Sequence, residues 1–144
     1  IKTGDSIIDA IINYKITVSK EFNIDFKTDI AVLPQLDYNS TDLCAIISNL
    51  LDNAIEATIK LEENKRSISI KMFTYKNYVT IIIKNSHANE IKISDNLINT
   101  SKDNDIIHGF GLKSVSAAVL KYSGLFKISN DENTFQAEVM LPIK

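Results

Sequence analysis

The fold class is decided by residues 67–83, which read SISIKMFTYKNYVTIII. Apolar and polar residues alternate on both sides of Tyr75-Lys76-Asn77, as in strands that have one buried face. A parallel crossover needs a dozen or more residues, so a link this short predicts an antiparallel hairpin. The hairpin excludes an all-parallel sheet.

Periodicity predicts three helices and three further strands around this hairpin. The first helix, at residues 5–22, is expected to bury one apolar stripe: Ile7, Ile11, Tyr14, Val18 and Phe22. The second begins near Thr41 and runs to about Leu61, and the third covers 112–122 and stops at Gly124. The strands are expected at 24–30, 125–129 and 134–141. Helices laid over one face of this mixed, mostly antiparallel sheet of about five strands give a two-layer α/β sandwich.

Composition indicates one folded domain over residues 1–144. The chain has 144 residues, 44% hydrophobic and 24% charged, which is ordinary for a globular domain. Sixteen basic and 18 acidic residues give a net charge of -2, so we expect no nucleic-acid partner. The single cysteine, Cys44, excludes an internal disulfide and a cysteine-rich metal site. Because the chain begins at Ile1 rather than Met, we expect a fragment of a longer protein.

Two asparagines in the second predicted helix form a candidate magnesium site. Asn49 and Asn53 are four residues apart, so their carboxamides share one helix face. Asp52 and Glu56 flank them with further oxygen atoms. Mg²⁺ binds oxygen ligands and usually shares them with substrate phosphates and water. A polar helix edge without function has the same pattern.

A glycine pair precedes the third predicted helix. Gly109 and Gly111 lie in HGFGL, residues 108–112, in a chain with only 4 glycines. Free amides at a helix start bind phosphate, and glycine lets the backbone approach closely. The stretch lacks the Lys of a Walker loop and the third glycine of a dinucleotide fingerprint. A simple tight turn is the alternative.

The polar residues between the last predicted strand of the hairpin and this glycine pair offer further candidates. Asn85 and Ser86 follow an apolar strand, where an asparagine could read adenine through two hydrogen bonds or only make a turn. Residues 86–108 form a long polar connection, which is typical of a lid or binding loop. Within it, Lys102 is either a phosphate contact or a solvated lysine. His108 is a loop-positioning residue, a phosphate contact or a general base.

In this order the motifs resemble the ATP-binding domain of the GHKL superfamily, which includes gyrases, chaperones and histidine kinases. The chain is most similar to the catalytic domain of sensor histidine kinases of the accessory-gene-regulator (AgrC-like) type, which sense peptide signals. The resemblance covers nearly the whole chain and rests on these segments: Asn49–Ala57, Asn85-Ser86, Thr100-Ser101-Lys102 and His108–Val115. It implies the Bergerat fold, with a lid at about residues 86–108.

The resemblance also assigns roles residue by residue. Asn53 matches the magnesium-ligating asparagine, and Asn49 the position where chaperones and gyrases hold a water-activating glutamate. An amide takes no proton at neutral pH, which suits a kinase that transfers its phosphoryl group. The phosphate-binding glycine box is matched by Gly109, Gly111 and Leu112. The lid is matched by Lys102 and His108, and the adenine position by Asn85.

Two departures from the family pattern are visible. The usual first glycine box, Asp-x-Gly-x-Gly, is replaced by Asn85-Ser86-His87-Ala88-Asn89, which has no glycine and no aspartate. Many of these kinases also carry a lysine three residues after the magnesium asparagine, where this chain has Glu56.

The resemblance implies a domain that binds Mg-ATP and donates the γ-phosphoryl group to a histidine. That histidine is expected on the dimerisation helices of the same full-length kinase, because neither His87 nor His108 lies in a suitable helix. A response regulator would act downstream. We expect a monomeric cytoplasmic domain of a membrane-bound kinase, without membrane contacts of its own. The alternatives are a degenerate interaction module and a protein-serine kinase of the anti-sigma-factor kind.

Overall fold

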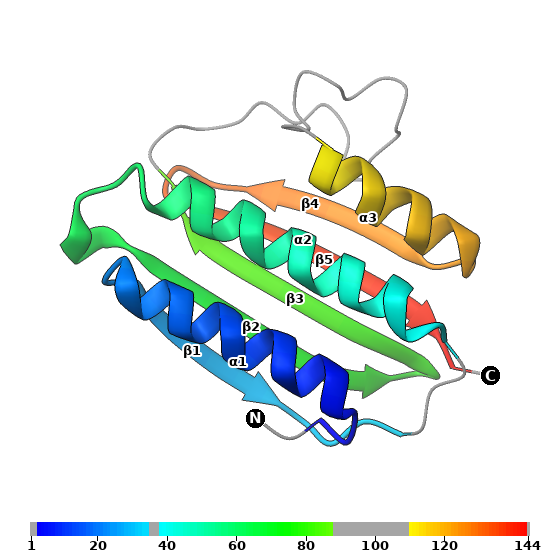
Figure 1. The fold of residues 1–144 in the computed structure, drawn as a ribbon. Coiled ribbons are helices and arrows are strands. Elements are labelled where there is room, and N and C mark those ends of the chain that lie inside the picture. The colour runs from blue at the N-terminus through cyan, green and yellow to red at the C-terminus, as the bar shows by residue number, and fades with distance from the viewer. Residues whose placement is uncertain (1–2, 35–37, 88–109, 144) are drawn as a thin grey trace.

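A layer of three helices covers one face of a five-stranded sheet (Figure 1). The structure is a computed structural model and describes residues 3–34, 38–87 and 110–143. The helices are α1 (Ser6–Glu21), α2 (Ser40–Thr58) and α3 (Phe110–Lys121), with a short 3-10 turn η1 at Glu63–Lys65. The strands are β1 (Asp25–Ile30), β2 (Ser67–Tyr75), β3 (Tyr78–Ser86), β4 (Leu125–Asn130) and β5 (Thr134–Pro142). The predicted two-layer sandwich is confirmed.

The sheet has the order β1-β2-β3-β5-β4. Only the β1–β2 pair is parallel, and the other three pairs are antiparallel. Lys76 and Asn77 have φ angles of 48° and 64°, which is the two-residue turn that matches the twist of a hairpin. The predicted antiparallel hairpin is therefore confirmed, and its link is one residue shorter than expected because Tyr75 belongs to β2.

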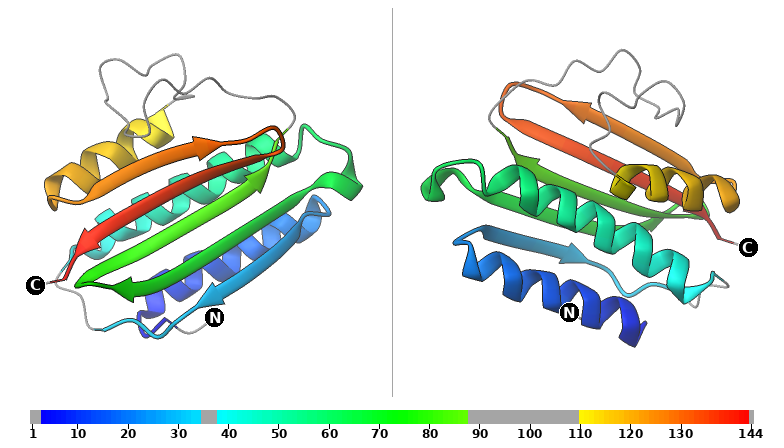
Figure 2. Two further views of the ribbon diagram at one scale, coloured as in Figure 1. Left: turned by 180° about the vertical axis from the view of Figure 1, so that it is seen from behind. Right: turned by 45° about the horizontal axis from the view of Figure 1, so that its top comes forward.

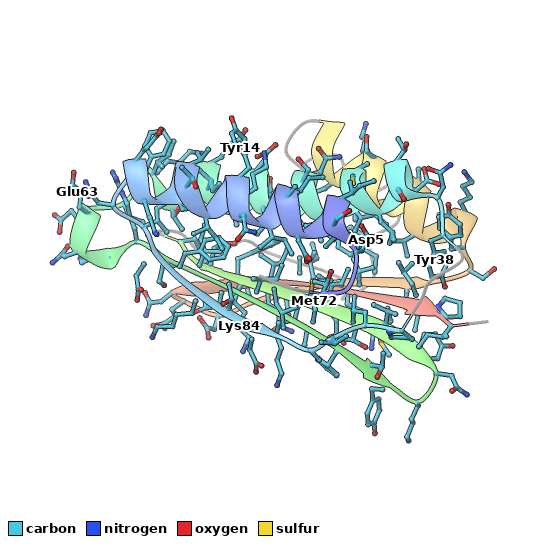
Figure 3. All side chains as sticks on the ribbon, turned by 60° about the horizontal axis from the view of Figure 1, so that its bottom comes forward. Asp5, Tyr14, Tyr38, Glu63, Met72 and Lys84 are labelled. Atoms are coloured by element: carbon cyan, nitrogen blue, oxygen red, sulfur yellow. The ribbon has the colours of Figure 1, made fainter. Side chains whose placement is uncertain are left out.

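The core lies between the helices and one face of the sheet, and no helix formed by the described residues covers the other face (Figure 2). Alternation in β2 buries Ile68, Ile70 and Met72, as predicted. Lys84 of β3 lies on the helix-free face, whereas Met72 points into the core (Figure 3).

The predicted apolar stripe of α1 is displaced by one position, although two of its members, Ile11 and Val18, pack partly buried against the core. Ile8 is 2% exposed and Ile12 is fully buried, whereas Ile7 and Tyr14 are 49% and 63% exposed. Tyr14 points away from the sheet (Figure 3). The helix carries isoleucines at both 7 and 8 and at both 11 and 12, so two neighbouring stripes fit the helical period. Packing against α2 selects the second stripe.

The helix ends are defined by side chains. Asp5 caps α1 by accepting from the backbone amides of Ile7 and Ile8 at 2.9 and 3.1 Å. Asn39 caps α2 by accepting from the amide of Thr41 at 2.8 Å, next to the predicted helix start near Thr41. Helix α2 ends at Thr58, earlier than the predicted Leu61.

Arg66 explains the early end of α2. Its guanidinium donates to the carbonyls of Ile59 and Leu61, at 3.0 and 2.9 Å, in the chain that leaves the helix. It also donates to the carbonyl of Phe22 at the end of α1, at 2.6 Å. A single side chain therefore binds carbonyls at the C-terminal ends of two helices, which is favourable for a cation.

The end of α3 differs from the prediction in detail. The left-handed position after the helix is occupied by Ser123, with φ 58°, and not by Gly124. Gly124 is required for another reason: a Cβ atom there would lie 2.5 Å from the carbonyl oxygen of Met140 in β5. The glycine thus allows the chain to pass closely over β5 as it leaves the helix.

Polar contacts tie the C-terminal end of α3 to the N-terminal end of α2. The carboxylate of Asp42 accepts from the Lys121 ammonium at 2.9 Å and from the Tyr122 hydroxyl. The Tyr122 ring also packs edge-on against Tyr38, with ring centroids 4.6 Å apart. These contacts, here called the Asp42 clasp, hold α3 antiparallel to α2 (Figure 1).

Substituting Gly124 by Ala should destabilise the fold by about 1–3 kcal/mol, because the added methyl meets backbone that cannot move freely. The neighbouring change Ser123→Gly should have the opposite sign and stabilise by about 0.5–1 kcal/mol, since it relieves the left-handed residue. Urea unfolding of both variants measures the two effects. Equal midpoints for both variants and the unsubstituted chain would contradict this account of the turn.

The Asp42 clasp should make stability depend on pH. Hydrogen bonds from Tyr122 and then Lys121 lower the pKa of the Asp42 carboxyl. A group whose pKa is lower in the folded state stabilises the fold above its unfolded pKa, and that contribution disappears as the pH falls through its folded pKa. Between about pH 6 and about pH 3, the unsubstituted chain should therefore lose more stability than Asp42→Asn.

Chemical unfolding at both pH values measures this difference. Asp29→Asn is the matched control, because Asp29 is exposed on β1 and makes no hydrogen bond or ion pair within the described residues. If Asp42→Asn and Asp29→Asn lose the same stability on acidification, the clasp does not contribute.

Candidate functional site

Asn49 and Asn53 lie on the flank of α2 that faces α3. Asp42, which contacts the end of α3, precedes Asn49 by seven residues, and Asn53 follows four residues later. These separations are close to whole helical turns, so all three side chains share one flank. Both asparagines are half-buried, which leaves their carboxamides accessible between the two helices.

The first turn of α3 comes level with this asparagine pair. The clasp fixes Lys121 beside Asp42, and the two helices run antiparallel. Leu112 is nine residues before Lys121, roughly 13.5 Å along the axis at 1.5 Å per residue. The same distance along α2 from Asp42 falls between Asn49 and Asn53. The fold thus brings together the asparagine pair and the predicted phosphate-binding helix start.

Gly111 lies in the first turn of α3, and the next residue, Leu112, is a buried residue of the core. Gly109, His108 and Lys102 lie outside the described residues, as does most of the predicted lid. The free amides of a helix start are oriented to receive an anion, and the helix dipole adds to the attraction.

Of the two carboxylates that were expected to flank the asparagines, Asp52 does not join this flank. Asp52 faces α1 instead, where its Oδ1 atom is 2.5 Å from the Lys15 ammonium. Glu56 is seven residues after Asn49 and is exposed. On the flank toward α3, the Asp42 carboxylate is held in the clasp, and the carboxamides of Asn49 and Asn53 remain accessible.

Asn85 is a buried residue of β3 and not a turn residue. It is 3% exposed and pairs with Ile68 of β2 and Phe135 of β5. Alternation along β3 puts it on the helix-facing side, in line with Ile81 and Ile83. Its Nδ2 donates to the Ser86 carbonyl at 3.0 Å. The turn interpretation is therefore wrong, and the amide lies at the end of the sheet beneath the helix layer.

Two more polar residues of this sheet end were not predicted as site residues. His87 is 8% exposed, and its backbone amide continues the ladder by donating to the carbonyl of Asn133 at 3.0 Å. Asn130 ends β4 opposite Phe135. Extending the alternation of β3 from Ile83 to residues 85 and 87 would have predicted that His87 lies on the buried face. Asn130 could be placed beside it only once the strand order was known.

The turn between β4 and β5 is held by Asp131. Its Oδ1 accepts from the backbone amides of Asn133 and Thr134 at 2.9 and 2.8 Å, and these bonds lower the pKa of the carboxyl. The carbonyl of Asp131 meets the Nε2 atom of His87 at 3.1 Å. The polar corner at the end of the sheet thus has a fixed backbone.

Other hollows lined by described residues lie elsewhere. One is formed by the start of α1 with Leu33 and Pro34, and another lies on the helix-free face between Lys27, Lys71 and Lys84. Within residues 3–34, 38–87 and 110–143 no three His, Cys, Asp or Glu side chains gather in a way that could hold a metal ion. None of the described helices is long and apolar enough to cross a membrane.

Comparison with known proteins agrees with this architecture. A family model described as "GHKL domain" matches residues 38–142. The sensor histidine kinase DpiB of Escherichia coli K12 is 27% identical over 104 residues, which cover 69% of this chain but only 18% of that protein. The chain therefore spans less than a fifth of the length of this relative.

Solved structures share the fold. The catalytic domain of the histidine kinase ThkA superimposes with a TM-score of 0.73 at 23% identity, over 98% of this chain and 93% of that one. The mycobacterial sensor kinase MprB gives 0.70 at 16% identity, over 95% of each chain. Acinetobacter baumannii AdeS gives 0.72 at 14% identity, over 96% of this chain and 64% of that one. With the family model matched from α2 to the last strand, the chain belongs to the GHKL domain family.

Proposed function

We propose that this chain binds Mg-ATP and donates its γ-phosphoryl group to a histidine, as the catalytic domain of a two-component sensor histidine kinase. The observation that supports this best is the meeting of Asn49 and Asn53 with the first turn of α3, held by the Asp42 clasp. Membership of the GHKL family and the similarity to a sensor histidine kinase point the same way.

The residues present fit a magnesium–phosphate group. No acidic cluster is available within the described residues, so the cation would take one or two amide oxygens from the protein and the rest from phosphate and water, as Mg²⁺ usually does. Bound Mg²⁺ would neutralise charge on the phosphates during transfer. Asn53 is the proposed metal ligand.

The remaining proposed contacts follow the path of the nucleotide. Amides of Gly109, Gly111 and Leu112 receive the phosphates at the start of α3, and Lys102 and His108 contact them from the lid. Asn85 receives the nucleobase at the end of β3. This division suits a triphosphate, because its charged end would meet a helix N-terminus and its base would meet the buried end of a central strand.

Asn49 favours transfer to a protein acceptor over hydrolysis. Its amide orients a neighbouring group by hydrogen bonding but does not accept a proton at neutral pH, so it activates no water molecule. Catalysis then rests on positioning and on neutralising charge. The half-buried place of Asn49 beside Asn53 puts it next to the proposed metal ligand.

The proposed acceptor is a histidine on the dimerisation helices of the same full-length kinase, with a response regulator downstream. We further propose that this domain lies on the cytoplasmic side of a membrane-bound sensor and is monomeric when isolated. We also propose that the full-length kinase belongs to the peptide-sensing (quorum-sensing) subgroup. A degenerate module without nucleotide turnover would lack ATP affinity. A serine kinase would give an acid-stable phosphoprotein, whereas phosphohistidine is acid-labile.

Replacing Asn53 by Ala should weaken magnesium-dependent ATP-analogue binding by about tenfold or more, because a metal ligand is lost. Calorimetric titration with a non-hydrolysable ATP analogue, with and without Mg²⁺, measures the loss. The matched control is Asn13→Ala, which makes the same change at an exposed position of α1 and should bind like the unsubstituted chain.

Unchanged Mg²⁺ dependence in Asn53→Ala would remove this residue from the metal site. A folded, unsubstituted chain that binds no nucleotide, alone or joined to its dimerisation helices, would leave the interaction module as the explanation.

A further inference from the structure

Two buried polar atoms without hydrogen-bond partners lie at one corner of the sheet. Four such side-chain atoms occur among the described residues, and they belong to Tyr38, Thr80, His87 and Asn130. Two of them, His87 Nδ1 and Asn130 Nδ2, lie where β3 ends and β4 meets β5. Leaving a buried polar atom unpaired is costly, so a pair of them in one place requires an explanation.

The strand register shows how these residues meet. Asn85, Phe135 and Asn130 are paired in one row across β3, β5 and β4, on the helix-facing side. His87 lies two residues beyond Asn85, and its Nε2 atom is 3.1 Å from the carbonyl oxygen of Asp131, the residue that follows Asn130. The imidazole thus reaches toward the end of β4, next to Asn130.

The contact with Asp131 determines what His87 can do. A carbonyl oxygen only accepts, so Nε2 must carry the hydrogen. In the neutral imidazole Nδ1 is then unprotonated and is an acceptor. Asn130 Nδ2 is an amide nitrogen, which only donates, and its hydrogens have no partner among the described residues. The corner therefore presents one unused acceptor and one unused donor, both withdrawn from water.

We infer that His87 Nδ1 and Asn130 Nδ2 read the base of the bound nucleotide, and that they favour a 6-aminopurine. This rests on the proposed nucleotide-binding function and adds the residues that choose the base. A 6-aminopurine has an exocyclic amine that donates beside ring nitrogens that accept, which complements an acceptor and a donor. It is also planar and largely apolar, so it can lie at a sheet end next to a buried Phe135.

The inference accounts for the missing aspartate of the first glycine box. The family's aspartate supplies a carboxylate acceptor at the position of Asn85, whose Nδ2 here donates to the Ser86 carbonyl. His87 supplies an acceptor from the next residue on the same side of β3. Buried water bound to both atoms is the competing explanation, and it predicts no effect on base choice.

Two substitutions of His87 separate reading from anchoring. In His87→Gln the side-chain amide can reach the place of Nε2 and keep the Asp131 contact, but Nδ1 is gone. In His87→Asn the amide oxygen lies near the place of Nδ1, and the Asp131 contact is lost. Their affinities are compared by calorimetry for ATP and for purine riboside triphosphate, which lacks the 6-amino group.

The unsubstituted chain should prefer ATP by about tenfold, the effect expected of one buried hydrogen bond. His87→Gln should lose this preference, and His87→Asn should keep it. A purely structural role predicts another pattern. Affinity for both nucleotides would fall more in His87→Asn than in His87→Gln, and the ratio of the two affinities would stay the same in both variants.

Asn130→Asp provides an independent test, because it replaces the amide donor by an acceptor of nearly equal shape. ATP binding should weaken by about tenfold or more. Asn133→Asp, at an exposed position of the same turn, adds the same charge and should bind ATP normally. This pair keeps the inference testable if His87 variants fail to fold.

Two results would overturn the inference, and they differ from each other. If the unsubstituted chain binds ATP, but the ATP preference survives in His87→Gln or Asn130→Asp binds normally, the corner holds water and the nucleotide site stands. If the chain binds neither nucleotide, the proposed function fails and the base-reading role fails with it.

Discussion

The burial of α2 between its neighbours is the constraint on which the rest of the structure depends. Its inner face buries eight side chains: Leu43, Ile46, Ile47, Leu50, Leu51, Ala54, Ile55 and Thr58. Each large apolar side chain contributes about 1.5–3 kcal/mol when buried, whereas an exposed ion pair contributes about 1 kcal/mol or less. Apolar packing therefore determines how α2 is rotated on the sheet.

The rotation of α2 on the sheet also determines which neighbouring helix each of its polar residues faces. Asp42, Asn49 and Asn53 are presented to α3, and Asp52 to α1, where Lys15 meets it. The ion pairs join α2 to each neighbour at the margin of the core. The candidate site thus lies at the margin of a core whose position is determined by buried apolar residues.

The sequence allowed the fold class to be predicted because its signals are local. Strict alternation in β2 and the two-residue turn at Lys76 and Asn77 leave few alternatives. The rotation of α1 was not predictable, since isoleucines occupy adjacent positions and only contact with α2 distinguishes Ile8 from Ile7. The turn after α3 was also not predictable in detail. Ser123 adopts the left-handed conformation that glycine usually takes, whereas Gly124 is needed because the chain passes close to the backbone of β5.

The candidate site was predictable where spacing along one element was enough, as for Asn49 and Asn53 on a helix. Its corner at the sheet end was not, because His87 and Asn130 are 43 positions apart and meet only through the order β3-β5-β4. The Asp42 clasp likewise joins residues about 80 positions apart. It also has a geometric consequence, because the clasp anchors α3 at the end far from the candidate site. A tilt of about 6° at Tyr122 would move Leu112, roughly 15 Å away along the helix, by about 1.6 Å. Shifts of that size are large enough to change a reaction rate by orders of magnitude.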